Sequence, residues 1–291
     1  MVKMKISVSS YSFRQYIRAG KMTQFDCVAK AKELGFDAIE FIDLDGKTLE
    51  EQKENAKKLK EEADRLGMEI NAYTIAANLY QDTREKMDAE VERLKGQLEV
   101  AAILGAGVLR HDVCHSLGKT GNARSFDLML PTIAENARRV SEYAVTLGIK
   151  TCSENHGMIA QDSDRVERLF NAVNHDNFGL LVDMGNFLCV DENPVTAVSR
   201  VAPYAIHAHA KDMLVRERPF DGYRMITRGG NYLMCTAVGE GDVPIEQCLR
   251  ILKKAGYEGY LSIEFEGRED CIEGIAKGLK NLKKYVAEVW G

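Results

Sequence analysis

The pattern of apolar and polar positions along this chain of 291 residues predicts a repeating unit, in which a helix is followed by a glycine and then by a strand. In the segments KELGFDAIEF, DRLGMEINAY and VTLGIKTCSE, a glycine follows an amphipathic stretch and precedes a run rich in apolar residues. Glycine suits the left-handed position that ends a helix, and the apolar run is typical of a buried strand. The first four such glycines are 32, 38 and 43 residues apart, which accommodates one strand and one helix per repeat: Gly35, Gly67, Gly105 and Gly148.

The pattern predicts eight strands, at residues 4–10, 37–43, 69–75, 107–112, 149–154, 178–183, 205–210 and 260–265. Because helices alternate with these strands, the strands should be parallel, and eight such units close into a barrel. A doubly wound open sheet is the main alternative, but no G-x-G-x-x-G follows the first strand. No linker or low-complexity run divides the chain. We therefore expect an α/β fold, a (β/α)8 TIM barrel, as a single domain over residues 1–291.

Composition narrows the classes of partner. The net charge of -5 and the pI of about 5.8 provide no broad basic surface for duplex nucleic acid. No window of about 18 uninterrupted apolar residues exists, so we expect no membrane span. The serines at positions 7, 9 and 10 interrupt the core that a signal peptide would need. The seven cysteines include no C-x-x-C pair, which favours reduced thiols and a cytoplasmic location. Homo-oligomerisation stays open.

Four successive strands are predicted to end near a side chain that can bind a metal: Glu154, Asp183, His209 and Glu264. Carboxylates are hard oxygen donors and the imidazole adds a nitrogen, a set that suits manganese, magnesium, cobalt or zinc. Three acidic groups at one barrel mouth would repel one another without a cation. The sequence therefore predicts one divalent metal ion at the carboxyl ends of the strands.

Side chains two positions apart on a strand share a face. In LSIEFE, Glu264 and Glu266 therefore point toward the barrel axis, while the apolar residues between them point toward the helices. The same rule places His156 on the face of Glu154, and Lys211 on the face of His209. These neighbours lie further out, where a substrate would approach. His207 shares the inner face as well, as a packing or supporting residue.

Other strand ends and one long loop supply further candidates. Glu40, near the end of the second strand, could orient a substrate hydroxyl or a neighbouring ligand. Arg110 and His111 end the fourth strand and point to opposite faces, so only one of them can enter the barrel. Residues 213–241 are long for a barrel loop, and we interpret them as a solvated lid rather than a phosphate cradle. Within this loop, Arg228 is the residue that we most expect to touch substrate.

These residues resemble the xylose isomerase-like TIM barrels, specifically the sugar phosphate isomerase/epimerase family. Relatives in that family include ketose 3-epimerases, hydroxypyruvate isomerase and inosose dehydratase. The resemblance covers essentially the whole chain, and its most specific motifs are Glu154-Asn155-His156-Gly157, Asp183-Met184-Gly185-Asn186 and His209-Ala210-Lys211-Asp212.

The resemblance implies a single divalent metal held by Glu154, Asp183, His209 and Glu264. It also implies that the two glutamates serve as the acid/base pair, and that His156 and Lys211 bind substrate oxygens. In ketose 3-epimerases a histidine follows three residues after the metal-binding Asp. Here that position is Asn186, which we carry as a candidate substrate contact. The endonuclease IV branch uses three zinc ions and more ligands than this chain supplies.

The predicted function is a divalent-metal-dependent sugar isomerase or epimerase. It would act on an α-hydroxy-carbonyl sugar or sugar derivative through an enediolate, with the glutamates transferring the proton. The same residues would also suit a dehydratase or lyase acting on a cyclitol or keto-sugar, or a non-catalytic sugar-binding barrel.

Overall fold

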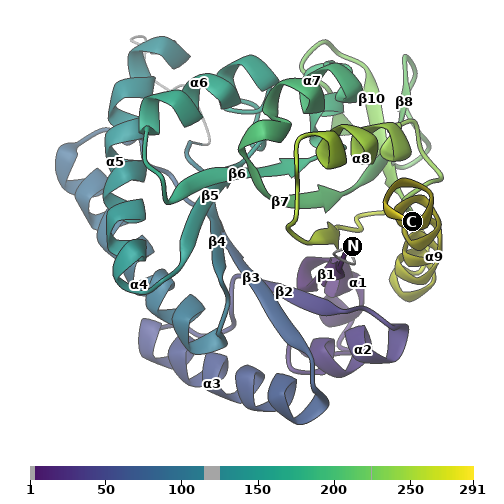
Figure 1. Ribbon diagram of the computed structural model, residues 1–291, viewed down its shortest axis with the longest axis horizontal. Helices are drawn as coiled ribbons and strands as arrows, with labels where there is room; N and C mark the ends of the chain where they lie inside the picture. Colours follow the sequence, from purple (N-terminus) through teal and green to yellow (C-terminus); the bar gives the residue numbers. More distant parts are fainter. Residues whose placement is uncertain (1–3, 115–124, 224) are drawn as a thin grey trace.

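The computed structural model describes residues 4–114, 125–223 and 225–291. Eight parallel strands close into a barrel in the order β1-β11-β7-β6-β5-β4-β3-β2 (Figure 1). The predicted (β/α)8 architecture is thus confirmed, and the open-sheet alternative is wrong. Each barrel strand lies within its predicted span: β1 (Ile6–Ser9), β2 (Ala38–Ile42), β3 (Glu69–Ile75), β4 (Val108–His111), β5 (Lys150–Glu154), β6 (Phe178–Asp183), β7 (Ala205–Ala210) and β11 (Leu261–Ile263).

Helices surround the strands on the outside of the barrel (Figure 1). The four glycines of the repeat all have positive φ, between 61° and 87°, as the helix-ending role requires. Thr48 caps the helix that follows it by accepting a hydrogen bond from the Glu51 N–H at 3.2 Å. The α-helices are α1 (Arg14–Arg18), α2 (Asp26–Leu34), α3 (Leu49–Leu66), α4 (Arg84–Leu104), α5 (Phe126–Thr146), α6 (Ser163–Val173), α7 (Pro194–Val201), α8 (Ile245–Lys254) and α9 (Cys271–Trp290).

Amphipathic packing joins the helices to the barrel. On α4 the apolar stripe expected from the sequence is fully buried at Val91, Leu94, Leu98 and Ala101. Charged residues occupy the opposite face of the same helix, where Lys95 pairs with Glu92 in solvent. The helix therefore covers the sheet with one face, as its period predicts.

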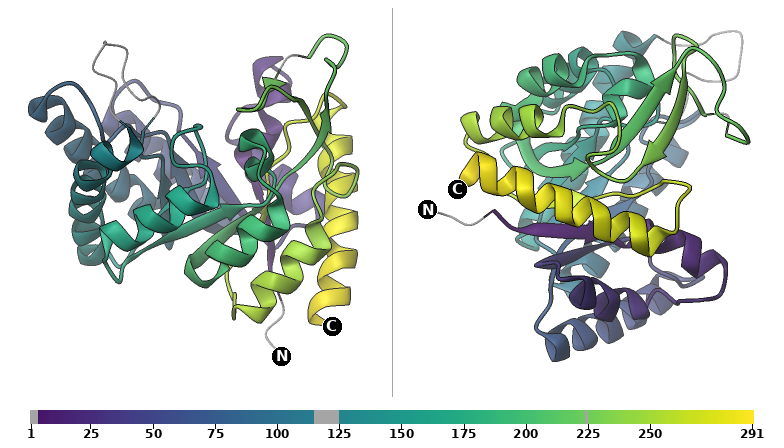
Figure 2. Two further views of the ribbon diagram at one scale, coloured as in Figure 1. Left: turned by 90° about the horizontal axis from the view of Figure 1, so that it is seen from above. Right: turned by 90° about the vertical axis from the view of Figure 1, so that its right-hand side faces the viewer.

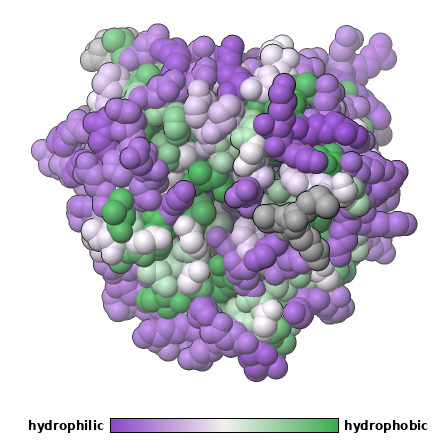
Figure 3. Space-filling view, viewed as in Figure 1, coloured by the Kyte–Doolittle hydropathy of each residue, from purple (hydrophilic) through white to green (hydrophobic). Residues whose placement is uncertain are grey.

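The termini lie at the end of the barrel where the strands begin (Figures 1 and 2). Figure 3 views this same end, where hydrophilic side chains cover the rim and hydrophobic ones gather toward the centre. Within the described ranges, none of the helices combines the length and apolar character needed to cross a membrane. All seven cysteines lie within the described residues, where they are buried and form no disulfide, as expected from their spacing.

Residues 212–216, 225–226 and 232–236 form a small sheet where the sequence analysis expects a solvated lid. Its strands are ordered β8-β10-β9, with β8 (Asp212–Arg216) and β10 (Tyr232–Thr236) antiparallel and β9 (Met225–Ile226) at the edge. The physical reason is a second apolar cluster, made by Cys189, Met213, Leu233 and Cys235. Figure 2 shows this sheet at the end of the barrel opposite the termini. Arg224, another arginine of the long loop, lies outside the described residues.

Asp212 attaches the small sheet to the barrel. Its carboxylate accepts hydrogen bonds from the backbone N–H groups of Gly239, Gly241 and Val243, at 2.8, 2.9 and 3.1 Å. A β-carbon at Gly241 would lie 2.2 Å from the same carboxylate, so the turn requires glycine there. Asp212, at the start of β8, thus holds the segment that follows β10 close to the barrel.

Candidate functional site

Four side chains converge at the carboxyl ends of the barrel strands. Glu154 and Asp183 end β5 and β6, His209 lies near the end of β7, and Glu264 immediately follows β11. One potential ligand atom from each lies within 4.8 Å of the others. His209 Nδ1 is 3.7 Å from Asp183 Oδ2, and 3.9 Å from both Glu154 Oε1 and Glu264 Oε1. The four side chains singled out in the sequence therefore surround one point.

Strand register and one asparagine determine this convergence. Asp183 pairs with His209 across β6 and β7, so the two residues end their strands at the same level. Asn155 accepts a hydrogen bond from the Asp183 N–H and donates one to its carbonyl, both at 2.9 Å. The Gly185 and Asn186 N–H groups donate to Asp183 Oδ1 at 2.8 Å. With Oδ1 engaged in this way, Oδ2 is the oxygen that faces the centre.

The two glutamates have different partners. Glu154 Oε2 lies 2.5 Å from the Arg110 guanidinium, and Oε1 accepts a 2.7 Å hydrogen bond from Asn186 Nδ2. Glu264 Oε2 accepts a 2.8 Å hydrogen bond from Lys211 Nζ. Arg110, Asn186 and Lys211 were expected to bind substrate, and each contacts one of the glutamates expected to transfer protons. Whether they also bind substrate stays a prediction.

Glu40 lies under the cluster and is fully buried. Its carboxylate reaches His207 Nε2 at 2.5 Å and His209 Nε2 at 2.8 Å. Burial alone would raise the pKa of Glu40, but the charges of His209 and His207 and their hydrogen bonds outweigh it and hold the pKa well below its ordinary value. Of the two roles predicted for Glu40, orienting a neighbouring ligand is the one that this contact favours. Such a carboxylate fixes the imidazole so that its other nitrogen faces a metal.

The donor set fits a divalent cation. Asp183 Oδ2 and His209 Nδ1 are buried and have no hydrogen-bond partner. Burial alone would lower the pKa of His209, yet the negative charge of Glu40 and the nearby carboxylates of Asp183 and Glu264 raise it well above its ordinary value. A site that draws a proton onto a buried imidazole favours positive charge at this position. Three carboxylates and one imidazole match the ligand preferences of zinc, manganese, cobalt and magnesium.

The residues of β4 border the cluster on one side. Arg110 enters the barrel, whereas the His111 ring packs 6.2 Å from the ring of Phe178. Asp112, which the sequence analysis missed, pairs with Arg110 at 2.9 Å and with His156 Nδ1 at 2.9 Å. Alternation along the strand could have found it, because residues 110 and 112 share a face.

His156 lies at the rim, with 45% of its side chain exposed. Burial of the ring would lower its pKa, but the hydrogen bond to Asp112 and the charge of that carboxylate outweigh burial and raise the pKa. The imidazole is thus held by one nitrogen while the rest of the ring stays accessible, which is consistent with the predicted contact to substrate.

Lys211 continues the site outward from Glu264. Its ammonium pairs with Glu264 and also with Glu266, and Glu266 pairs with Arg14 at 2.9 Å. Burial alone would lower the pKa of Lys211, but the two carboxylates raise it well above its ordinary value. The sequence analysis did not single out Arg14, since it lies about 250 residues from Glu266 along the chain.

Arg228 connects the small sheet to the segment after β5. Its guanidinium pairs with Asp162 at 3.0 Å and donates to the Met158 carbonyl. These contacts show how the protein holds the Arg228 guanidinium. They do not test the expected contact with substrate, which stays a prediction.

Comparisons with known proteins agree with this architecture. Residues 28–285 match the sequence family described as xylose isomerase-like TIM barrel. The inosose dehydratase of Clostridium beijerinckii is 24% identical over 165 residues, which cover 55% of this chain and 54% of the relative. The chain therefore spans about half the length of that curated relative.

Two solved structures share the fold over nearly their whole length. The IOLI protein, crystallised with a zinc atom, superposes with a TM-score of 0.76 at 17% identity, covering 98% of this chain and 99% of that one. A D-tagatose 3-epimerase-like protein superposes with a TM-score of 0.72 at 22% identity, covering 98% of each chain. At these identities the likeness shows the fold alone.

Proposed function

The chain belongs to the xylose isomerase-like TIM barrel family, and from this premise we propose that it is a divalent-metal-dependent sugar isomerase or epimerase. Its substrate would be an α-hydroxy-carbonyl sugar or sugar derivative. One observation carries the proposal: two glutamates from separate strands reach the same point as Asp183 and His209, with potential ligand atoms within 4.8 Å. Such an arrangement offers both a cation site and two groups that can exchange protons with a substrate.

In this proposal, Glu154, Asp183, His209 and Glu264 hold one metal ion. When bound there, the ion would supply Lewis-acid polarisation of the substrate carbonyl. The zinc atom in the IOLI structure and the donor set found here both support this assignment. Glu40 keeps His209 oriented through its 2.8 Å contact with Nε2.

The two glutamates would carry the proton. One removes it from the carbon next to the carbonyl, and the other returns a proton from its own side of the substrate. Return to the opposite face of the same carbon gives an epimer, whereas return to the neighbouring carbon gives an isomer. Arg110 and Lys211, which contact Glu154 and Glu264 respectively, keep each carboxylate oriented. His156 at the rim would bind a substrate oxygen.

A dehydratase acting on a cyclitol or keto-sugar is the second candidate. The similarity to an inosose dehydratase favours it. The same proton abstraction begins this reaction, but a β-hydroxyl then leaves as water, and the second glutamate would protonate that leaving group. The two candidates share their residues and differ in what happens to the hydroxyl.

Solvent-deuterium exchange tests the proposal. The protein would be incubated in D2O with zinc, manganese, cobalt or magnesium and a panel of keto-sugars and keto-cyclitols. We expect deuterium to enter at least one compound, in a reaction that a chelator abolishes. A product with no mass change other than that of deuterium would identify an isomerase or epimerase, and loss of water would identify a dehydratase. No exchange with any combination would refute the proton-transfer mechanism and favour a non-catalytic barrel.

A further inference from the structure

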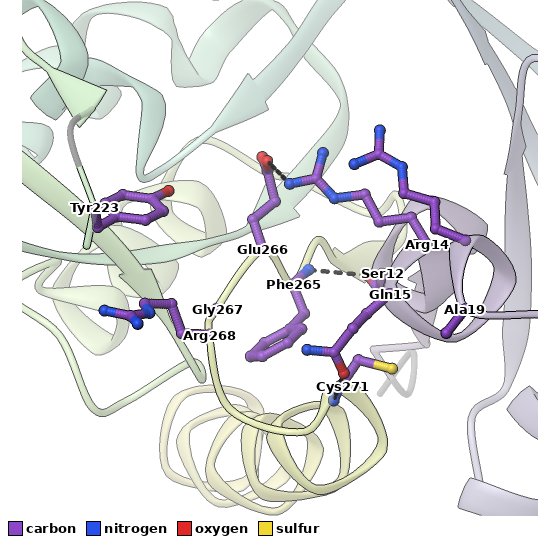
Figure 4. A pocket seen from close by; sticks show the side chains of 11 residues that line it. Ser12, Arg14, Gln15, Ala19, Tyr223, Phe265, Glu266, Gly267, Arg268 and Cys271 are labelled. Atoms are coloured by element: carbon purple, nitrogen blue, oxygen red, sulfur yellow. Dashed lines mark hydrogen bonds and ion pairs between the residues drawn. The ribbon is translucent and has the colours of Figure 1, made fainter. Parts of the chain in front are cut away.

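A cavity borders the barrel mouth beside Glu266, next to the cluster of potential metal ligands. Its volume is about 480 Å3, and it lies between the segment that follows β1 and the loop that follows β11. Figure 4 shows Arg14 and Gln15 on one side of this cavity, Tyr223 and Arg268 on the other, and Glu266 between them.

The charges around this cavity are unbalanced. Arg14, Arg18 and Arg268 supply three guanidinium groups, whereas Glu266 is the only carboxylate among the described residues that line the cavity. Both oxygens of Glu266 are already engaged, one by Lys211 and the other by Arg14. Its negative charge is therefore shared between Lys211 and Arg14, and it pairs with neither Arg18 nor Arg268 in the described structure.

Two of the three arginines have donors available for a ligand. Among the described residues, the Arg18 side chain has no hydrogen-bond or ion-pair partner, and the Arg268 guanidinium donates only to the backbone carbonyl of Asp221. The Arg14 guanidinium has more protein partners, because it pairs with Glu266 and also stacks on the Tyr11 ring at 4.1 Å. Planar guanidinium groups bind phosphate and carboxylate oxygens in pairs, and these two arginines are free to do so.

Tyr223 adds a neutral hydroxyl to the cavity. Among the described residues, its hydroxyl hydrogen-bonds only to the sulfur atoms of Met225 and Cys235, both at 3.9 Å. Burial, followed by the nearby Cys235, raises the pKa of this tyrosine to about 12, so the hydroxyl stays protonated at neutral pH. A protonated hydroxyl with weak partners is a suitable donor to an anion.

We propose that this cavity, lined by Arg14, Arg18 and Arg268, binds an anionic group of the substrate, a phosphate or a carboxylate. The proposal rests on the proposed function, because it assigns the carbonyl end of the same substrate to the strand-end cluster. Glu266 lies two residues beyond Glu264, roughly 7 Å along an extended chain, and Lys211 contacts both. A keto-sugar with a terminal anionic group would extend from one site to the other.

Binding of inorganic phosphate tests the cavity without catalysis. Metal-free protein, kept in chelator, would be titrated with phosphate and with acetate by calorimetry. We expect phosphate binding that weakens about tenfold in the double variant Arg18→Gln/Arg268→Gln, because charge-assisted hydrogen bonds are lost. Arg65→Gln, on the exposed end of α3, is the matched control and should bind as the wild type does. The same comparison with acetate reports on carboxylates.

No binding of either anion, or equal binding by the double variant, would overturn the proposal. Both exposed substitutions should leave the fold intact, and circular dichroism would verify this. The Arg14→Gln variant provides an independent check, because it should weaken anion binding while freeing Glu266 Oε2.

Substrate kinetics separate this proposal from the proposed function. With metal present, a neutral keto-sugar, its phosphate ester and the corresponding sugar acid would be compared by deuterium exchange. In the double variant we expect the KM of the preferred anionic sugar to rise about tenfold relative to that of its neutral counterpart. Exchange with neutral sugars, without any preference for an anion, would overturn the anion site and leave the catalytic proposal intact. Phosphate binding that depends on the arginines, without deuterium exchange into any sugar, would support the anion site and overturn the catalytic proposal.

Discussion

The two sides of the barrel mouth hold their glutamates in different ways. Glu154 ends a five-residue strand that pairs with neighbours on both sides, and 3% of its side chain is exposed. Glu264 follows a strand of three residues, and 11% of its side chain is exposed. Asn186 and Arg110 hold the Glu154 carboxylate, whereas Lys211 is the residue in the described part of the chain that holds the Glu264 carboxylate. Residues that look equivalent in the sequence therefore differ in their exposure and in the partners that hold them.

This difference indicates how the β5 side, with Glu154, and the β11 side, with Glu264, could have different roles in the proposed proton transfer. On the β5 side, two buried side chains, Arg110 and Asn186, engage both oxygens of the Glu154 carboxylate. On the β11 side, Lys211 pairs with both Glu264 and Glu266, and Glu266 lines the arginine-lined cavity. The cation that contacts Glu264 is therefore close to where a substrate would bind. We infer that Glu154 is positioned before substrate arrives, and that the position of Glu264 responds to substrate.

The largest expected effect tests whether both glutamates are required. Glu154→Gln and Glu264→Gln should each reduce deuterium exchange at least about 100-fold, because each removes a group that accepts a proton. Both should also weaken metal binding, measured by competition with a chelating dye. If either variant kept turnover near the wild-type rate, that glutamate would not be a proton carrier and the comparison between the two sides would fail.

Glu40→Gln should lower metal affinity about 10- to 100-fold, which is the usual cost of losing the carboxylate behind a metal-binding histidine. The carboxylate contacts His209 Nε2 at 2.8 Å, so its removal frees the ring to reorient. Glu69→Gln, on an exposed glutamate that pairs with Lys5, is the control. Unchanged affinity in Glu40→Gln would show that strand geometry alone orients His209.

The two sides also differ in the side chain that clamps each strand end. Asn155→Ala would leave the buried N–H and C=O of Asp183 without their amide partner, and should lower the free energy of unfolding by about 2 kcal/mol or more. Ser12→Ala removes a hydroxyl that donates to the Ile263 carbonyl and accepts from the Phe265 N–H. We expect a loss of about 1 kcal/mol there. Denaturant unfolding of both variants measures the difference, and a larger loss for Ser12→Ala would reverse our ranking of the two sides.

The smallest effect on stability is expected at Arg228. Its pair with Asp162 is partly exposed, so Arg228→Gln should cost less than about 1 kcal/mol in unfolding free energy. If Arg228 touches substrate as predicted, KM should nevertheless rise severalfold. A variant with both wild-type stability and wild-type KM would limit Arg228 to bridging the small sheet and the segment after β5.

Much of the fold and of the central cluster could be predicted from the sequence, because the signals are local. A glycine after an amphipathic stretch marks a helix end wherever it occurs, as Gly35 and Gly67 illustrate. Parallel strands in a barrel then end at one rim, so a polar residue that closes each strand is brought to the same place. Glu154, Asp183 and His209 needed no further information.

The outer parts of the site depend on contacts that carry no local signal. The ion pair between Arg14 and Glu266 joins residues about 250 positions apart and exists only because the barrel closes. The small sheet was missed because its strands are short, with five residues in β8 and β10 and two in β9, so they give a weak signal of alternation. Asp112 was missed for a different reason, since the alternation rule was not applied beyond Arg110.

The pairing of β1 with β11 has a consequence for how this protein folds. Ile6 pairs with Leu261 and Val8 with Ile263, so the barrel closes through contacts between distant parts of the chain. Contacts of such long sequence separation form slowly, because the intervening chain must first be ordered. Glu264 directly follows the closing strand and is the last of the four clustered residues in chain order. Barrel closure and completion of the cluster thus belong to one folding event, and a metal ion that bound all four residues would select chains that have finished it.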